Sequence, residues 1–357
     1  MRIINIILSS QNGGAEQVFI DYLAVLKKLN HQLLAITKID APFVSEVEKL
    51  EIEIKKVKNN LGYHDFFAIK KIRKIIKDFK ADCVIAHVGR SVVLVKKALG
   101  KNSDVKLIAV NHSPNVKRSI GSDLIFSVNK EIFCKTINLG QKENASFVIP
   151  NAIDLSDAVF AERIINFSGK DEIVLGAMGR FQSCKGFHVL LKSLKILQNG
   201  NKKIILKIAG SGVEEENLKK LTKDLGLQNL VEFCGWIKDK KSFFQGLDIF
   251  CMPSIDITGE TFGLVLLESM KNKTPIITSN CDGPKDVVRD ETDGLVFNVR
   301  ESNEEEIVKE LADKINYLIA NEELANNMVL NAFTRVRDKF SYAALESRFR
   351  EIFGPQN

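Results

Sequence analysis

A chain of 357 residues is too long for one ordinary domain and suits two. Hydrophobic residues make up 45% of it, enough for two cores, and no apolar run approaches the ~20 residues of a transmembrane helix. The first ten residues, MRIINIILSS, are apolar but run directly into a Gly-rich turn without a small-residue cleavage site. This start favours a buried strand over a signal peptide.

The cysteines also limit the classes of protein to consider. All six lie far apart and none forms a CxxC pair. This spacing argues against a zinc site or a disulfide framework and suits a reducing cytosol. We therefore expect no metal site.

Charge is distributed unevenly along the chain. Residues 1–170 hold 26 Lys/Arg and 17 Asp/Glu, a net charge of +9, whereas residues 171–357 hold 25 and 28, a net charge of −3. Many of the cations lie between residues 55 and 80. They indicate either a solvated helix face or a surface that meets anionic lipid or a phosphorylated acceptor. No nucleic-acid partner is expected.

Short β-branched runs alternate with amphipathic segments in the first part of the chain. Strands are predicted at residues 3–8, 33–37, 83–87, 106–111, 124–128 and 147–149, with a helix at 15–29. This alternation predicts a parallel sheet with helices on both faces.

The same pattern then starts again. Strands are predicted at residues 173–178, 204–209, 231–234, 249–252 and 275–278, and helices at 187–198, 214–225 and 264–271. Residues 153–170 lack periodicity and are expected to link two units, whereas 302–353 are mostly helical. The predicted fold class is α/β, with two doubly wound Rossmann-like domains facing across a cleft. We expect domains at 1–165 and 166–339, with a helix at about 340–357 packing back on the first domain.

Doubly wound sheets bind ligands beyond the carboxyl ends of their strands, so the turns there are the places to search. In the segment GETFGLVLLE, Phe262, Gly263 and Leu264 begin a predicted helix whose backbone N–H groups are free to hold phosphate. Glu260 and Glu268 lie on either side of this helix start. Two carboxylates near an anion site suit sugar and ribose hydroxyls, although a helix cap and a partly exposed Glu explain them as well.

A second turn, GRFQSCKG, carries Arg180 and Lys185. Two cations around a flexible loop can clamp a diphosphate, the Arg by its fork and the Lys as a point charge. In a transferase they would stabilise the leaving nucleoside diphosphate without a metal. The turn lacks the Gly-Lys-Ser/Thr ending of a Walker loop, and stray surface charges remain the alternative.

The turns of the first domain are less specific. Gly13 and Gly14 precede a helix and suit a phosphate or sugar that approaches the backbone. His112 follows a strand and is expected to point into the cleft, unless it is a turn-capping or core histidine. His87, at the end of another strand, is a weaker candidate.

Taken in order, these turns resemble the retaining glycosyltransferase family 4, also called the glycosyl transferases group 1, which has the GT-B fold. The C-terminal domain of that family carries a G-R-x(n)-K-G loop, an A-G-x-G strand end, an F-x-G turn and a P-S…E-x7-E helix. The matching residues here are Gly179-Arg180, Lys185-Gly186, Ala209-Gly210-Ser211-Gly212, Phe233-Cys234-Gly235, Pro253-Ser254, Glu260 and Glu268. The N-terminal domain matches at Gly13-Gly14-Ala15-Glu16, at His112 and at residues 150–154. Asp286 departs from the family, where Glu is common.

The resemblance implies a role for each matching residue. The catalytic residues would be His112 beside the reacting sugar, Glu260 on the donor sugar, and Arg180 and Lys185 on the donor diphosphate. Donor binding would also involve Gly13, Gly14, Phe262, Gly263, Leu264 and, on the ribose hydroxyls, Glu268.

The resemblance also implies an activity. A retaining, metal-independent glycosyltransferase without a cofactor would move a sugar from a nucleotide-diphospho sugar, UDP-linked, to a glycan or lipid-linked acceptor. Lipopolysaccharide or surface polysaccharide synthesis is the expected context, in the cytoplasm and at the inner face of the membrane. A GT-B-like sugar-nucleotide epimerase and a non-catalytic sugar-nucleotide binding protein are the alternatives.

Overall fold

The computed structural model describes residues 1–158, 163–200, 202–257 and 259–354. Its contacts divide into two compact units, one comprising Met1–Ala152 with Phe340–Asn357, the other Ile153–Lys339. This division comes earlier in the chain than residue 165, because Ile165 and Phe167 already pack in the core of the second unit. Part of the expected linker, 159–162, and the last three residues of the expected C-terminal helix lie outside the described residues.

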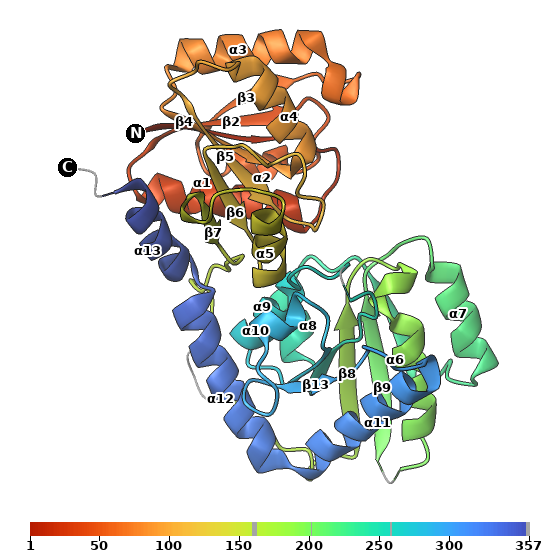
Figure 1. Cartoon of the computed structure of the whole chain (residues 1–357). Helices are drawn as coiled ribbons and strands as arrows, with labels where there is room; N and C mark the ends of the chain where they lie inside the picture. Colours follow the sequence, from red (N-terminus) through yellow and green to blue (C-terminus); the bar gives the residue numbers. More distant parts are fainter. Residues whose placement is uncertain (159–162, 201, 258, 355–357) are drawn as a thin grey trace. The chain divides into compact units, whose positions relative to one another are not determined.

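The first unit is built on a seven-stranded sheet in the order β3-β2-β1-β4-β5-β6-β7, and every neighbouring pair is parallel (Figure 1). The strands are β1 (Arg2–Ile7), β2 (Gln32–Lys38), β3 (Glu53–Val57), β4 (Cys83–His87), β5 (Lys106–Asn111), β6 (Leu124–Ser127) and β7 (Ser146–Val148). The helices are α1 (Gly14–Lys28), α2 (Val44–Glu48), α3 (Phe66–Phe79), α4 (Val88–Leu99), α5 (Lys130–Asn138) and α13 (Tyr342–Phe353), with short 3-10 turns η1 (Gly62–His64) and η2 (Glu143–Ala145).

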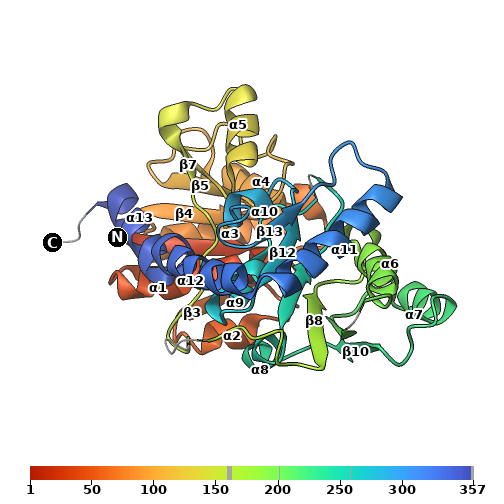
Figure 2. The same cartoon turned by 90° about the horizontal axis from the view of Figure 1, so that it is seen from below.

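Helices cover both faces of this first sheet. Alternate residues of a strand point to opposite faces, so Ile4 packs in one cluster with residues of α3 and α4, whereas Ile3 packs in another with residues of α1 and α13. The terminal helix α13 lies beside α1, where the Tyr342 hydroxyl donates a 2.7 Å hydrogen bond to Asp21 Oδ1 (Figures 1 and 2). The last helix of the chain thus completes the core of the first unit.

The second unit holds a six-stranded parallel sheet in the order β10-β9-β8-β11-β12-β13. Its strands are β8 (Glu172–Met178), β9 (Lys203–Ala209), β10 (Val231–Gly235), β11 (Ile249–Met252), β12 (Ile276–Ser279) and β13 (Leu295–Phe297). Its helices are α6 (Phe187–Leu197), α7 (Glu215–Asp224), α8 (Lys240–Gln245), α9 (Leu264–Lys271), α10 (Pro284–Val287), α11 (Glu304–Ala320) and α12 (Glu322–Lys339), with the 3-10 turn η3 (Ser183–Lys185). Apolar residues of α6 and α11 share one core with β8 and β9.

Both sheets reverse their strand order beside the first strand, between β1 and β4 in one unit and between β8 and β11 in the other. In an open parallel sheet, ligands bind beyond the carboxyl ends of the strands at such a switch point. The loops after β1 and β4, and those after β8 and β11, therefore mark the ligand-binding edge of each unit. The predicted fold class, with two doubly wound α/β units, is confirmed.

Candidate active site

In the second unit, the loops after β8 and β11 meet at the switch point and bring Lys185 and Glu260 into contact. The Lys185 ammonium forms an ion pair with Glu260 Oε2, and the Ser254 hydroxyl donates a 3.4 Å hydrogen bond to the same oxygen. The two charged side chains are only 22% and 13% exposed. Partial burial strengthens a charge pair relative to one in bulk water. The structure thus joins two residues that the sequence placed on separate motifs.

Gly186 is the residue that lets these two loops approach each other. Its φ of +67° lies in the left-handed region, and a Cβ there would come within 1.8 Å of the Pro253 carbonyl oxygen. The Ile255 N–H donates a 3.0 Å hydrogen bond to the Cys184 carbonyl, which ties the same loops together. Only glycine fits this position, because any side chain would push the loops, and with them Lys185 and Glu260, apart.

Arg180 lies on the same loop as Lys185 but in a different environment. Its side chain is exposed, and within the described part of the chain no ion pair or hydrogen bond of its guanidinium is found. The turn at Gly210 packs directly against the start of this loop, because a Cβ on Gly210 would come within 1.9 Å of the Gly179 carbonyl oxygen. The glycine of the A-G-x-G strand end therefore serves loop packing, and Arg180 keeps its donors available for an anion.

Helix α9 begins as the sequence predicted, at Leu264. Gly263 is its N-cap, with a φ of +85° and no side-chain cap, so the start of the helix keeps N–H groups for an anion. The Phe262 ring is buried, so that this residue can reach a ligand only through its backbone. Glu268, further along α9, forms a 2.9 Å ion pair with Lys240 at the start of α8. Sequence reasoning missed Lys240, because nothing distinguishes it from the neighbouring lysines.

In the first unit, Gly13 and Gly14 follow β1 at the edge that the switch point marks. Gly13 is the N-cap of α1 with an extended backbone (φ −151°), so its conformation does not require glycine. A Cβ on it would come within 3.3 Å of the carboxylate of Glu16, a buried residue in the first turn of the helix. A side chain at Gly13 would therefore require the Glu16 carboxylate to shift slightly, whereas the backbone conformation itself does not require glycine.

His112 and His87 come together at the carboxyl ends of β5 and β4. His87 Nδ1 lies 3.0 Å from His112 Nε2, and the rings stack with centroids 5.2 Å apart. Burial lowers the pKa of His112 from 6.5 to about 4, and burial together with the neighbouring His112 lowers that of His87 well below 6.5. Both rings are therefore neutral at pH 7, and a single proton occupies the hydrogen bond between them.

The backbone directly after His87 is strained. Val88 has a φ of +60°, which is a rare conformation for a β-branched residue and costs of order 1–3 kcal/mol. Nearby, the Leu8 N–H at the end of β1 donates a 2.9 Å hydrogen bond to the Ser91 hydroxyl of α4. This hydrogen bond ties the first turns of α4 to the end of β1. The sequence carried no signal for the strain, because it arises from packing between distant segments.

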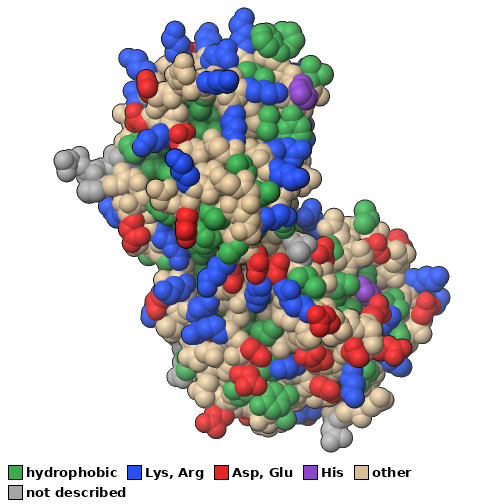
Figure 3. All heavy atoms as spheres, in the orientation of Figure 1, with side chains coloured by type: hydrophobic (Ala, Val, Ile, Leu, Met, Phe, Trp, Pro, Cys, Tyr) green, Lys and Arg blue, Asp and Glu red, His purple; other side chains and the backbone are tan. Residues whose placement is uncertain are grey.

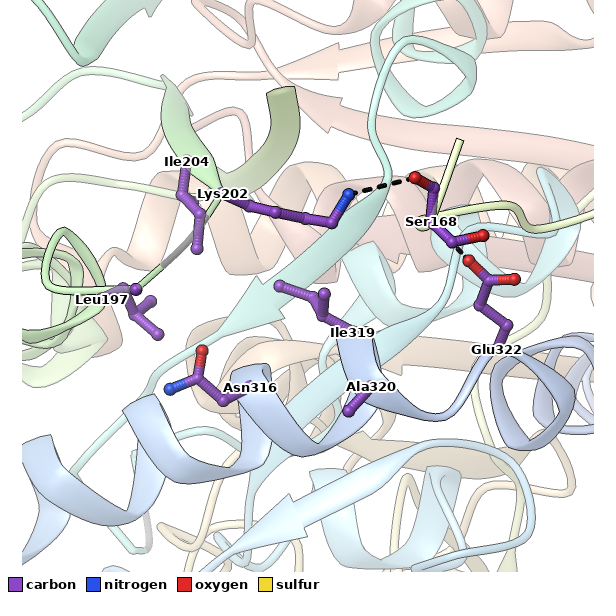
Figure 4. A pocket seen from close by; sticks show the side chains of 9 residues that line it. Ser168, Leu197, Lys202, Ile204, Asn316, Ile319, Ala320 and Glu322 are labelled. Carbon is purple, nitrogen blue, oxygen red and sulfur yellow. Dashed lines mark hydrogen bonds between the residues drawn. The ribbon is translucent and has the colours of Figure 1, made fainter. Parts of the chain in front are cut away.

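A separate hollow of about 480 Å³ lies in the second unit between α6, β9 and the end of α11 (Figure 4). It lies at the amino end of β9, on the edge of the sheet away from Lys185. The Lys202 ammonium donates to the carbonyl oxygens of Phe167, Ser168 and Lys170, at 2.8, 3.3 and 2.7 Å. The Lys202 ammonium is thus already hydrogen-bonded to backbone carbonyl groups, so this hollow is not the candidate site.

The described residues contain no group of three or more His, Cys, Asp or Glu side chains placed to hold a metal ion. Within the same residues, none of the helices has the length and apolar character needed to cross a bilayer.

Comparison with known proteins gives consistent matches along the chain. Residues 160–335 match the family model described as "Glycosyl transferases group 1", and residues 12–157 match "Glycosyltransferase Family 4". A protein of Haemophilus influenzae, described as an uncharacterized glycosyltransferase, is 30% identical over 316 residues, which cover 85% of this chain and 87% of that protein. The lipopolysaccharide core biosynthesis glycosyltransferase LpsE of Rhizobium meliloti is 25% identical over 342 residues, 96% of each chain.

The crystal structure of Anabaena Alr3699/HepE in complex with UDP aligns over 100% of both chains with a TM-score of 0.83 at 19% identity. This structural likeness confirms the GT-B fold class.

Proposed function

The chain belongs to the glycosyl transferases group 1, and on this premise we propose that it moves a hexosyl group from a UDP-sugar to a glycan or lipid-linked acceptor, with retention at the anomeric carbon. Lipopolysaccharide or surface polysaccharide synthesis is the proposed context. The name of the Rhizobium relative supports the context, and the UDP bound to the Anabaena protein supports the nucleotide.

The contact between Lys185 and Glu260 is the observation that carries this proposal. In a nucleotide-diphospho sugar, the β-phosphate is bonded directly to the anomeric carbon of the sugar. A cation and a carboxylate in contact with each other can therefore bind these two adjacent groups. The lysine would bind the phosphate, and the glutamate would accept hydrogen bonds from the sugar hydroxyls. Arg180, on the same loop, is available for the rest of the diphosphate, and Glu268 is assigned to the ribose hydroxyls.

The proposed reaction exchanges one bond at the anomeric carbon for another on the same face. The bond between that carbon and the β-phosphate oxygen breaks, and its electron pair leaves with UDP. Lys185 and Arg180 stabilise the negative charge that develops on the phosphate. The acceptor hydroxyl oxygen bonds to the anomeric carbon, and its proton passes to an oxygen of the leaving phosphate.

In the first unit, we propose that His112 contacts the donor sugar and that the Gly13-Gly14 turn contacts the donor phosphates. A neutral imidazole suits the first role, because it exchanges hydrogen bonds with hydroxyls and adds no charge next to the reacting carbon. The first turn of α1 suits the second role, since its N–H groups have no capping side chain.

A donor screen tests the proposal. The purified protein is titrated with UDP-, GDP- and ADP-sugars, and binding and slow donor hydrolysis are followed. Binding of a UDP-sugar and a transfer product in cell extract, identified by mass spectrometry, are expected. The anomeric configuration of the product, read by NMR, tests retention. Failure of every donor to bind overturns the proposal, and an isomerised donor formed without acceptor indicates an epimerase instead.

Two substitutions test the residue assignment. Lys185→Ala and Glu260→Ala are expected to lower turnover by about 10²–10³-fold with the fold preserved. Lys203→Ala is the matched control, because Lys203 also pairs with a glutamate, Glu172, at the opposite edge of the same sheet. Wild-type turnover in a folded Lys185 or Glu260 variant would refute the role of that residue.

A further inference from the structure

Helix α3 exposes two aromatic rings followed by a stripe of cations. Phe66 and Phe67, its first two residues, are 67% and 77% exposed. The exposed lysines Lys70, Lys74 and Lys77 follow at helical spacing on the outer face. Lys and Arg side chains gather over α3, with hydrophobic side chains at one end of this surface (Figure 3). Two adjacent, largely exposed phenylalanines at the end of a basic stripe are unusual for a face that is only solvated.

The position of this surface is fixed by the core of the first unit. The opposite face of α3 buries Ala68, Ile72, Ile75 and Ile76 against the sheet. Arg73 donates two hydrogen bonds, of 2.8 and 2.9 Å, to the carbonyl oxygens of Ala98 and Lys97 at the end of α4. Helix α3 therefore cannot turn its aromatic rings inward without losing these contacts.

The loop before α3 is held equally firmly. The Asp65 carboxylate caps the helix by accepting from Ala68 N at 3.0 Å, and it also accepts from Asn60 N at 2.9 Å and Leu61 N at 3.2 Å. Leu61 is itself 64% exposed, so the loop before α3 carries a third large exposed apolar side chain. The apolar end of α3 is thus a structured feature of the fold.

Sheet topology places this apolar end at the ligand-binding edge of the unit. In the parallel sheet, the loop after β3 leads into α3 at the same edge where β1, β4 and β5 end. That edge carries Gly13 and His112, to which the proposed function assigns donor contacts. The far end of α3 returns toward the start of β4, so the lysines extend away from the site.

We propose that the outer face of α3 docks on an anionic lipid bilayer, with Phe66, Phe67 and Leu61 inserted among the lipids and the lysines on headgroup phosphates. The stripe from residue 66 to residue 77 extends over about 16 Å of helix, which is longer than one phosphate group and matches a charged plane. Aromatic rings at one end of a basic helix suit the interface, where rings are buried and lysines reach phosphates. Docking would bring the edge that carries His112 to a lipid-linked acceptor; this last step rests on the proposed function.

Vesicle sedimentation with the full-length protein tests the docking surface. Vesicles of phosphatidylcholine with about a third phosphatidylglycerol are expected to bind the protein, and pure phosphatidylcholine vesicles to bind it far more weakly. Replacing Lys70, Lys74 and Lys77 together by Gln should weaken binding at least about tenfold at low salt and have little effect at ~0.5 M NaCl. Replacing Phe66 and Phe67 by Ser should weaken binding at least about tenfold at both salt concentrations, because the lost contact is apolar.

Matched control variants lie in the second unit. Replacing the exposed lysines of α7, Lys219, Lys220 and Lys223, by Gln removes the same charge as the α3 lysine variant. Replacing Tyr317 and Leu330, which are 47% and 45% exposed, by Ser removes exposed apolar area elsewhere. Both controls should bind vesicles as the wild type does.

Two results would overturn the docking surface: no binding of the wild type to anionic vesicles at low salt, or α3 variants that bind as tightly as their controls. Thermal unfolding checks that each variant is folded. Donor binding in the absence of vesicles should be unchanged in the α3 variants, so it separates the two proposals. If the protein binds a UDP-sugar but no vesicles, the proposed function stands and the docking surface is refuted. If it binds anionic vesicles but no UDP-sugar, the docking surface stands and the proposed function is refuted.

Discussion

Acidification should destabilise the first unit through the stacked pair of the buried His87 and the half-buried His112. The unfolded chain takes up a proton on His112 as the pH falls below about 6.5, whereas the folded chain keeps this imidazole neutral until about 4. The folded state thus binds fewer protons in this window, and stability is lost as the pH falls through it. Between about pH 7.5 and pH 5, His112 alone accounts for a loss of about 2 kcal/mol. His87, whose pKa is also lowered, acts in the same direction.

Hydrogen exchange measures this effect in the right part of the molecule. The amides of β4 and β5 belong to the core of the first unit, and their opening free energies at the two pH values report its stability. The one tryptophan, Trp236, lies in the second unit, so its fluorescence follows that unit separately. The His112→Gln variant removes the titrating imidazole, and its loss of stability on acidification should be smaller than that of the wild type by about 2 kcal/mol.

His64 provides the matched control. It is an exposed histidine of the same unit, in η1, and His64→Gln removes one imidazole without disturbing the contact between His87 and His112. The reasoning fails if His112→Gln and the wild type lose the same free energy between the two pH values. It also fails if His64→Gln reduces the pH dependence as much as His112→Gln does.

Three further substitutions probe the second unit. Lys240→Gln should raise the KM for the nucleotide sugar several-fold and leave kcat nearly unchanged, because Lys240 pairs with Glu268. If Glu268→Gln raises the KM but Lys240→Gln does not, this role of Lys240 is contradicted. Arg180→Lys should lower kcat by about tenfold or more without changing the melting temperature, since the fork is lost and the side chain is exposed; wild-type kcat would remove its role. Gly186→Ala should destabilise the second unit by about 2 kcal/mol or more, measured by urea unfolding with Trp236 fluorescence, because its Cβ would strike the Pro253 carbonyl. Gly226→Ala, also at positive φ but with open space around it, should cost only about 1 kcal/mol; equal losses would contradict the packing argument.

The buried strands could be predicted from the sequence, whereas two peripheral ones could not. The predicted strands at 83–87, 106–111 and 249–252 agree with β4, β5 and β11, because strands buried on both faces appear as continuous apolar runs. β3 was missed because it is an edge strand that exposes Lys55 and Lys56, which interrupt the pattern. β13 was missed because it follows the Asp293-Gly294 turn almost directly, so that its three residues did not stand out as a separate apolar run.

The sequence predicted which turns would carry candidate residues, but it did not predict which of those residues would meet. A parallel sheet brings the carboxyl ends of its strands to one edge, so the turns that follow the strands were expected to lie together. The contacts of Lys185 with Glu260, and of His87 with His112, join residues from loops far apart in the sequence. Such contacts depend on strand order and loop packing, which no local pattern encodes.

The two units supply different electrostatics to the reaction that we propose. The second unit presents charged groups, Lys185 and Arg180 for the leaving diphosphate and Glu260 for the sugar, where charge develops as the bond to phosphate breaks. The first unit presents His112, which its burial against His87 keeps neutral at pH 7. An imidazolium would add a positive charge, whereas a neutral ring exchanges hydrogen bonds with a sugar hydroxyl without adding charge. The same burial that makes the first unit sensitive to acid is therefore what suits His112 to its proposed role.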